Sequence, residues 1–503
     1  MDTTNNIIMK NIKFITGLVV CNILSINLLA NANELKEEPK EINSIADAFL
    51  NGKVKGLLRY SGQYRDSKYH ILQDDPSKPK KDVKVQSYSA LGGYLGYETA
   101  PFKSFSLGAT FYTSNPFLGE NSDSRKGLGG LYEEDGGQDS YSVLGEAYLK
   151  YQNDEHRFVL GRQEMPSYRF VSLTNVRMTP VIHEGVTYEN TSIDGLKINT
   201  AFITGQKDRN SITFDGMIRA SRVSLGEVKS EDGTVVRTQI RGSYNKENYD
   251  ASGNYIGEEK SMPMIGLIYS KENFSLEAWD YYVDDFLNTA YFYGDYSFKI
   301  YENLKLSLSA QYGNQQDVGE HVAGNIDSWF YGARVKASIN SGMNFFLAYN
   351  EVNYNENSYD SGTIFVRWGT PQMFNSFQIQ DSELAGTKSV GVGAFFDLGA
   401  LNVLDSTIVR VRYADYDLPD DINMLDARQD RTETTFELRY AFEKKSNFSL
   451  FSQIDGLSIL FRLAYNKFSN DYDYESYKKE HDFSFSKVND DFIDVRLYLD
   501  YVF

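Results

Sequence analysis

The chain has 503 residues, a length that suits either several soluble domains or one large closed barrel. Tyr and Phe number 37 and 32 against only 10 Pro, a composition that favours many β-strands joined by short turns. Asp and Glu outnumber Lys and Arg by 69 to 51, and the resulting net charge of −18 argues against nucleic acid as a partner.

The first 32 residues carry the features of a secretory signal peptide. Lys10 and Lys13 precede an apolar run over residues 14–29, and Ala30 and Ala32 supply the small residues of a cleavage site. Translation starts at either Met1 or Met9. The single cysteine, Cys21, lies inside this segment, so the mature chain is expected to have no thiol, no disulfide and no cysteine-based metal site.

Residues 33–53 are hydrophilic and then mildly amphipathic at Ile42, Ile45, Ala48 and Phe49. This segment is predicted to lie on the periplasmic side. A short helix, a segment tucked into a barrel mouth and a flexible leader all fit the pattern.

From residue 54 to the end, apolar and polar residues alternate in segments of strand length. In the last segment, the even positions Asp494, Arg496 and Asp500 are charged and the odd positions from 493 to 503 are apolar. One apolar face and one charged face fit a barrel wall between lipid and water, whereas an amphipathic strand of a soluble sandwich is the alternative. Tyr501 and the terminal Phe503 resemble the assembly signal of bacterial outer-membrane barrels.

Eighteen such strands are predicted, an even number of the kind that bacterial single-chain barrels have. Their ranges are 54–65, 86–98, 104–114, 142–152, 156–164, 184–190, 195–206, 263–270, 273–283, 289–300, 304–313, 328–339, 343–353, 388–397, 406–416, 432–443, 457–468 and 491–503. Short connections alternate with long polar ones, as between periplasmic turns and outer loops. The segment 363–369 is a candidate for a further strand. Aromatic residues at strand ends, Tyr291 and Trp329 among them, predict interfacial girdles.

Several stretches resemble OprD-like (Opr family) outer-membrane porins. They are Ser44–Gly56 (SIADAFLNGKVKG), Leu91–Pro101 (LGGYLGYETAP), Leu160–Gln163 (LGRQ), Arg177–Pro180 (RMTP) and Glu184–Asn190 (EGVTYEN). The resemblance implies an 18-stranded barrel, passive uptake of small solutes, an arginine ladder and an inward-folded third loop. The segment 207–262 is longer than the resemblance leads us to expect.

The alternation places one set of charged residues on the polar faces, where they would line a pore. This predicted set is Arg59, Arg334, Lys336, Arg410, Arg412, Glu433, Glu437, Arg439, Arg462 and Arg496. A column of cations would draw anions or carboxylates, but Glu433, Glu437 and Asp494 point the same way and could simply pair with the arginines. The third outer loop, roughly 165–183, is predicted to narrow the pore through Tyr168, Arg169, Ser172 and Arg177, with a solvated surface loop as the alternative.

No metal, cofactor or catalytic signature stands out. The five histidines are scattered, and no nucleophile elbow, phosphate loop or dinucleotide fingerprint is present. The acidic outer-loop residues Asp415, Asp417, Asp420, Asp421 and Asp426 would suit Ca²⁺ or form a solvated acidic surface.

The sequence therefore predicts an all-β, antiparallel, up-and-down transmembrane β-barrel over residues 54–503, located in a bacterial outer membrane. Its expected function is that of a non-enzymatic porin for small hydrophilic solutes, with a preference for anionic or carboxylate-bearing ones. The alternatives are a barrel with a surface-binding (adhesin or structural) role and a barrel enzyme. Expected partners are outer-membrane lipid and lipopolysaccharide, the barrel assembly machinery, further copies in a homotrimer, and the solutes.

Overall fold

The computed structural model describes residues 42–71, 80–118, 128–132, 139–165, 168–171, 177–226, 228–229, 235–369, 373–419, 429–442, 455–469 and 487–503. At 68–71, 80–84, 228–229, 235–237 and 487–489 only the backbone is described. The predicted signal peptide lies outside these ranges. Among the described residues, no helix is long and apolar enough to cross a membrane.

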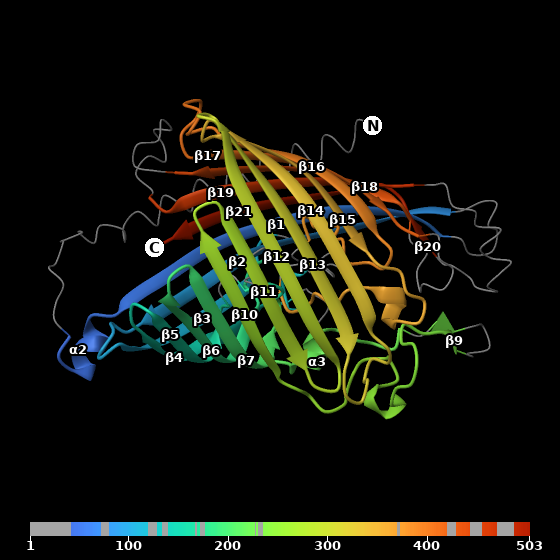
Figure 1. Cartoon of the computed structure of the whole chain (residues 1–503), viewed down its shortest axis with the longest axis horizontal. Coiled ribbons are helices and arrows are strands. Elements are labelled where there is room, and N and C mark those ends of the chain that lie inside the picture. Colours follow the sequence, from blue (N-terminus) through green and yellow to red (C-terminus); the bar gives the residue numbers. More distant parts are fainter. Residues whose placement is uncertain are drawn as a thin grey trace.

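Eighteen long antiparallel strands form one closed barrel. Figure 1 shows that the strands are tilted. They are β1 (Lys53–Ile71), β2 (Lys80–Glu98), β3 (Phe105–Pro116), β4 (Tyr141–Gln152), β5 (His156–Gln163), β6 (Ile182–Ile193), β7 (Leu196–Lys207), β10 (Met262–Lys271), β11 (Phe274–Val283), β12 (Leu287–Tyr301), β13 (Leu304–Asp317), β14 (Asp327–Ile339), β15 (Met343–Val352), β16 (Lys388–Asp397), β17 (Thr407–Asp417), β18 (Arg431–Ala441), β19 (Leu457–Phe468) and β21 (Phe492–Val502). Each pairs with its neighbour in sequence, and β21 pairs with β1 to close the wall.

The predicted all-β barrel and its eighteen strands are confirmed. The largest differences from the predicted ranges are in β1 and β2. Strand β1 continues to residue 71 instead of 65, and β2 begins at residue 80 instead of 86, so the first hairpin is longer than predicted. A short strand β20 (Lys487–Asn489) pairs with this extension of β1. The segment 363–369 is not a strand, so that suggestion was wrong.

The two faces of the wall differ in exposure, as the alternation predicts. On β13, Ser307, Ser309 and Gln311 are buried inside the barrel, whereas Leu308 and Tyr312 are exposed on the outside. Tyr291, predicted to belong to the girdle at the outer rim, is fully buried on the inner face of β12, so its ring does not contribute to a lipid-facing girdle, whereas the next residue, Phe292, is exposed on the outside. An apolar outer band is what a lipid-facing barrel wall requires.

The two ends of the barrel are unlike. At the turn end, connections are short, as at 153–155, 194–195 and 302–303, and helix α2 (Ile45–Leu50) follows its N-cap Ser44 there. At the loop end lie α3 (Met217–Ala220), β8 (Val228–Lys229), β9 (Val235–Arg237), η3 (Lys246–Asn248) and η4 (Tyr359–Gly362). Figure 1 shows α2 and β9 at opposite ends. The described part of the long 208–261 connection thus contains the paired strands β8 and β9 and two short helices, which the sequence patterns did not reveal.

The loops at this end share an apolar core. Met217 and Ile218 of the 208–261 loop, Val322 of the next long loop and Trp368 of the 353–387 loop are buried in one cluster. Loops are generally surface-exposed and have no such core. Residues of the barrel wall, such as Tyr281 and Phe330, belong to the same cluster, so the packing holds these loops against the inner face of the wall.

Candidate functional site

All ten residues of the predicted pore-lining set lie on the inner face of the wall. Each occupies the same alternation phase as inward neighbours such as Ser309, Ala414 and Ala464, which are buried. Arg59, Glu433, Glu437 and Arg496 are buried, Arg334, Lys336, Arg410, Arg412 and Arg462 are half-buried, and Arg439 is exposed towards the turn end. The structure thus brings these side chains into one interior.

The third loop connects β5 and β6, and its described residues 164–165, 168–171 and 177–181 lie inside the barrel. Near its start, Arg169 forms two hydrogen bonds with the Glu277 carboxylate of β11, at 2.8 and 2.6 Å. Phe170 packs against Tyr281 and Tyr291, at ring-centre distances of 5.8 and 5.3 Å. Tyr168 is also buried, 5.5 Å from Trp279 between ring centres.

The far end of the third loop reaches a different part of the wall. Arg177 donates to the Gln63 side-chain oxygen of β1 at 2.6 Å, and its own carbonyl accepts a 2.7 Å hydrogen bond from Arg59. The loop is therefore anchored on β11 at one end and on β1 at the other. Ser172, the remaining predicted member, lies outside the described residues.

The seventh loop connects β15 and β16, and its described residues 353–369 and 373–387 also enter the barrel, which the sequence pattern did not predict. Its apolar part is buried, and the Trp368 indole donates to the carbonyl of Met217 at 3.0 Å. Further along, the aromatic rings of Phe374 and Phe377 lie 4.5 and 4.4 Å from the guanidinium carbons of Arg334 and Arg412. The signal available in the sequence was the apolar run at 363–369, which a solvated loop has no reason to contain.

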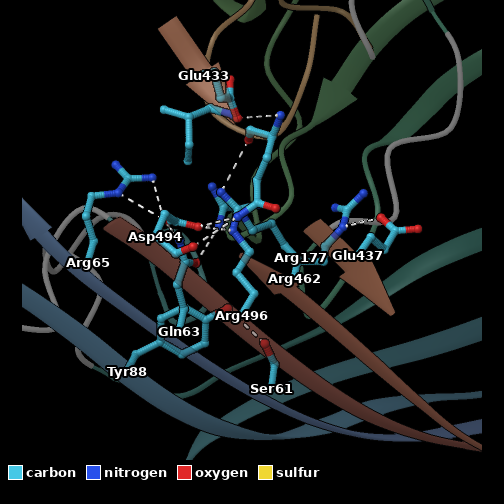
Figure 2. A network of polar contacts seen from close by, with 12 residues as sticks. Ser61, Gln63, Arg65, Tyr88, Arg177, Glu433, Glu437, Arg462, Asp494 and Arg496 are labelled. Carbon is cyan, nitrogen blue, oxygen red and sulfur yellow. Dashed lines mark hydrogen bonds and ion pairs between the residues drawn. The ribbon is translucent and has the colours of Figure 1, made fainter. Parts of the chain in front are cut away.

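Asp494 of β21 is fully buried, and Figure 2 shows it beside Gln63, Arg65 and Arg496. Its carboxylate accepts hydrogen bonds at 2.7–2.9 Å from four side chains: Gln63, Arg65, Arg496 and Gln378. Gln378 belongs to the seventh loop, and Gln63 is the residue that binds Arg177 of the third loop. This carboxylate therefore links the wall to both inward loops.

Some inner cations are paired with carboxylates. Arg59 binds Asp500 at 2.6 Å. Arg462 and Arg410 share Glu437, at 2.7 and 3.6 Å. In these pairs the acidic residue offsets the positive charge, as one of the sequence alternatives proposed.

Other inner cations have no carboxylate within ion-pair distance in the part of the chain that the structure describes. These are Arg177, Arg334, Lys336, Arg412 and Arg439. Glu433, expected to neutralise the arginines of β17, instead accepts from the backbone of the seventh loop. Burial and the nearby Arg496 lower the pKa of Arg177 to about 10, which still leaves it charged at neutral pH.

Two acidic side chains of the inward loops, Asp381 and Glu164, have raised pKa values, which favour their uncharged forms. Burial and the neighbouring Glu383 raise the pKa of Asp381 well above its ordinary value. Burial and the neighbouring Glu146 raise the pKa of Glu164. Both shifts reduce the negative charge that these loops contribute to the interior.

No group of three or more His, Cys, Asp or Glu side chains arranged to hold a metal occurs among the described residues. Asp415 and Asp417 are exposed at the loop end of β17, and Asp420, Asp421 and Asp426 lie outside the described ranges. At the turn end, Tyr501 and Phe503 stack with ring centres 5.8 Å apart, and Phe503 exchanges two backbone hydrogen bonds with Gly56.

The family model of the outer membrane porins of the OprD family matches residues 105–481. The fold is similar to OccK9 (OpdG) of Pseudomonas aeruginosa, with a TM-score of 0.65 and 17% identity over 90% of this chain and 99% of that one. It is also similar to OccAB3 of Acinetobacter baumannii, with a TM-score of 0.66 and 15% identity over 90% and 99%. A third similar structure is P. aeruginosa OpdK with vanillate, with a TM-score of 0.61 and 17% identity over 90% and 98%. No curated protein sequence matches the chain.

Because the family model covers more than half of its length, the chain belongs to the OprD family of outer-membrane porins. The predicted family, fold class and outer-membrane location are confirmed. The family and fold support a channel for small solutes, and this assignment accords with the expectation of a non-enzymatic protein.

Proposed function

We propose that this porin favours anionic solutes, and small carboxylates in particular. The observation that carries the proposal is the imbalance among inner charges: Arg177, Arg334 and Arg412 lack a carboxylate partner in the described chain, whereas Asp494, Glu433 and Glu437 each have several donors. The carboxylates are thus engaged by the wall and loops, and the excess of positive charge remains available to a solute.

The overall charge of −18 does not oppose this preference. At physiological ionic strength the Debye length is ~8 Å, so charges on distant loops are screened at the constriction. Charges that line a narrow passage act on a solute at contact distance, and low-dielectric walls strengthen their effect. The inner charges therefore decide selectivity.

A structural neighbour agrees with a carboxylate substrate class. OpdK of P. aeruginosa was solved with vanillate, an aromatic carboxylate. A pore that combines arginines with stacked phenylalanines, as at Arg412 and Phe377, offers both charge and an apolar surface to a solute of that kind.

Proteoliposome uptake tests the proposal. The uptake rate of a small carboxylate is compared with those of an alkylammonium and a neutral solute of similar size. We expect uptake to be fastest for the carboxylate, slower for the neutral solute and slowest for the alkylammonium. Equal rates, or fastest uptake of the alkylammonium, would contradict an anion preference. No uptake of any solute would favour the surface-binding or enzymatic alternatives over a channel.

The remaining expectations complete the proposal. A signal peptide over residues 1–32 would direct the chain to the envelope, and the barrel assembly machinery would insert it. The exposed apolar outer face would contact lipid and lipopolysaccharide, or further copies in a homotrimer.

A further inference from the structure

The central part of the seventh loop is held by hydrogen bonds to one carboxylate. The backbone N–H groups of Gln378, Ile379 and Gln380 donate to Glu433 of β18, at 3.0, 3.1 and 2.8 Å. The Glu433 side chain has 0% exposure. Three consecutive N–H groups converging on one carboxylate form a nest that favours negative charge, as the anion-binding turns of other proteins do.

A second carboxylate holds the same turn from the neighbouring part of the wall. The Gln378 side-chain amide donates to Asp494 at 2.8 Å, and Arg496, which lies beside Asp494, donates to the Gln378 carbonyl at 3.4 Å. Glu433 and Asp494 lie on β18 and β21, which are separated by β19. The loop is therefore fixed at two points on the wall.

Further contacts define the ends of this segment, residues 375–382, which we call the strap. Its first residue, Asn375, donates to Asn350 of β15 and Ser389 of β16, both at 3.0 Å. Near its other end, Gln380 donates to Asn466 of β19 at 3.0 Å. The strap thus follows the inner wall from β15 and β16 to β21.

We propose that Glu433 and Asp494 are positioning residues that clasp the strap to the wall and so set the free cross-section of the pore. Glu433 acts through the backbone of the strap rather than as a charge offered to the solute. Asp494 also accepts a hydrogen bond from Gln63, which in turn binds Arg177, so the same carboxylate helps to position the end of the third loop that lies near the strap. This inference rests on the proposed channel function but concerns aperture rather than charge preference.

The chain offers a matched pair of variants on one strand. Glu433→Gln and Glu437→Gln each remove one negative charge from β18, but Glu437 contacts only the wall residues Arg462 and Arg410 among its described partners. At position 433, one carboxylate oxygen becomes an NH₂ group that faces backbone donors, so the nest loses hydrogen bonds. At position 437 the strap contacts are unchanged.

The first measurement is hydrogen exchange of the strap amides in the full-length protein in detergent, which does not depend on conduction. We expect exchange to rise by roughly tenfold or more in E433Q, on the order expected when charge-assisted hydrogen bonds are lost, and to match wild type in E437Q. Heat-modifiable electrophoretic mobility establishes that both variants are folded. If the strap amides of E433Q exchange at the wild-type rate, Glu433 does not hold the strap to the wall and the inference is wrong.

The second measurement is single-channel recording with solutes of graded size. E433Q should show greater open-channel noise and admit bulkier solutes, whereas E437Q should keep both properties and shift only ion selectivity. Gln380→Cys with Asn466→Cys, joined by a short thiol crosslinker in the E433Q background, should restore wild-type noise. The only native cysteine, Cys21, lies in the predicted signal peptide, so labelling is specific.

The outcomes separate the two proposals. Faster strap exchange in E433Q with unchanged noise and size limit would show that the strap does not set the aperture, which overturns this inference alone. Equal changes in E433Q and E437Q would assign the effect to charge and overturn it as well. A wild-type protein that conducts without anion preference would contradict the proposed function but leave the exchange comparison intact.

Discussion

The guanidinium carbon of Arg412 lies 4.4 Å from the ring centre of Phe377, so a cation of strand β17 packs on an aromatic side chain of the seventh loop. Its Nε donates to Thr435 at 3.2 Å, and the described residues place no carboxylate within 4.0 Å of it. An aromatic face holds the guanidinium in place without cancelling its charge. Arg412 is therefore both positioned and available to an anion.

Replacing Arg410 and Arg412 together with Ala should shift selectivity towards cations and slow carboxylate uptake. Each removed charge acts at short range in a partly dehydrated passage, where a change of about 1 kcal/mol in the free energy of an ion corresponds to ~5-fold in permeability. Bilayer reversal potentials of the double variant measure the effect. Lys467→Ala, at an exposed outward position of β19, is the control and should match wild type. An unchanged reversal potential in the double variant would assign these arginines a structural role.

Arg169→Ala should free the first half of the third loop and raise conductance. The variant loses the two hydrogen bonds to Glu277 and leaves that carboxylate inside the barrel without its arginine. Arg169→Lys keeps the charge but cannot form the same bidentate hydrogen bonds with the carboxylate, so the conductance of this variant should fall between those of wild type and Arg169→Ala. Single-channel current amplitudes decide this, and wild-type amplitudes in Arg169→Ala would mean that the third loop does not limit the current.

Deleting Phe503 should impair assembly of the barrel. The deletion removes both backbone hydrogen bonds with Gly56, 2.9 and 3.1 Å long, where the last strand meets the first. The ring also lies against Gly56, so that a Cβ added there would be 2.2 Å from it. The amount of folded protein in the outer membrane is the measurement. Phe503→Tyr keeps the ring and should assemble normally, and normal assembly of the deletion variant would show that the terminal aromatic is dispensable.

The isolated protein should be a heat-modifiable β-barrel. A closed sheet leaves no edge from which detergent can open the hydrogen bonds, so unheated and heated samples should migrate differently in electrophoresis. Circular dichroism in detergent should show predominantly β structure before heating. A predominantly helical spectrum or identical mobility of the two samples would contradict the barrel.

The wall could be predicted from sequence because lipid and water impose a two-residue period on every strand. Leu308 faces outward and the next residue, Ser309, faces the barrel interior. This alternation follows from the strand itself, so no knowledge of distant contacts is needed. The same logic placed Arg412 and Glu437 on the inner face. The girdle prediction for Tyr291 did not use this alternation but its place near a strand end, and the ring is buried on the inner face.

The packing of the third and seventh loops inside the barrel could be predicted only in part because it depends on contacts between distant segments. Glu433 is read from its strand as a possible partner of Arg412, yet it binds the N–H groups of residues 378–380, which any sequence would supply. Backbone donors leave no compositional signal. Arg177 was assigned to the third loop from sequence, but its contact with Gln63 of β1 required the fold.

The most direct test of anion preference is the zero-current potential of the wild-type channel in a planar bilayer with concentrated KCl on one side and dilute KCl on the other. If the arginines that have no carboxylate partner among the described residues govern the passage, Cl⁻ crosses faster than K⁺ and the dilute side becomes negative. A dilute side that becomes positive would show that K⁺ is favoured, as the net charge of −18 alone suggests, and would contradict the account.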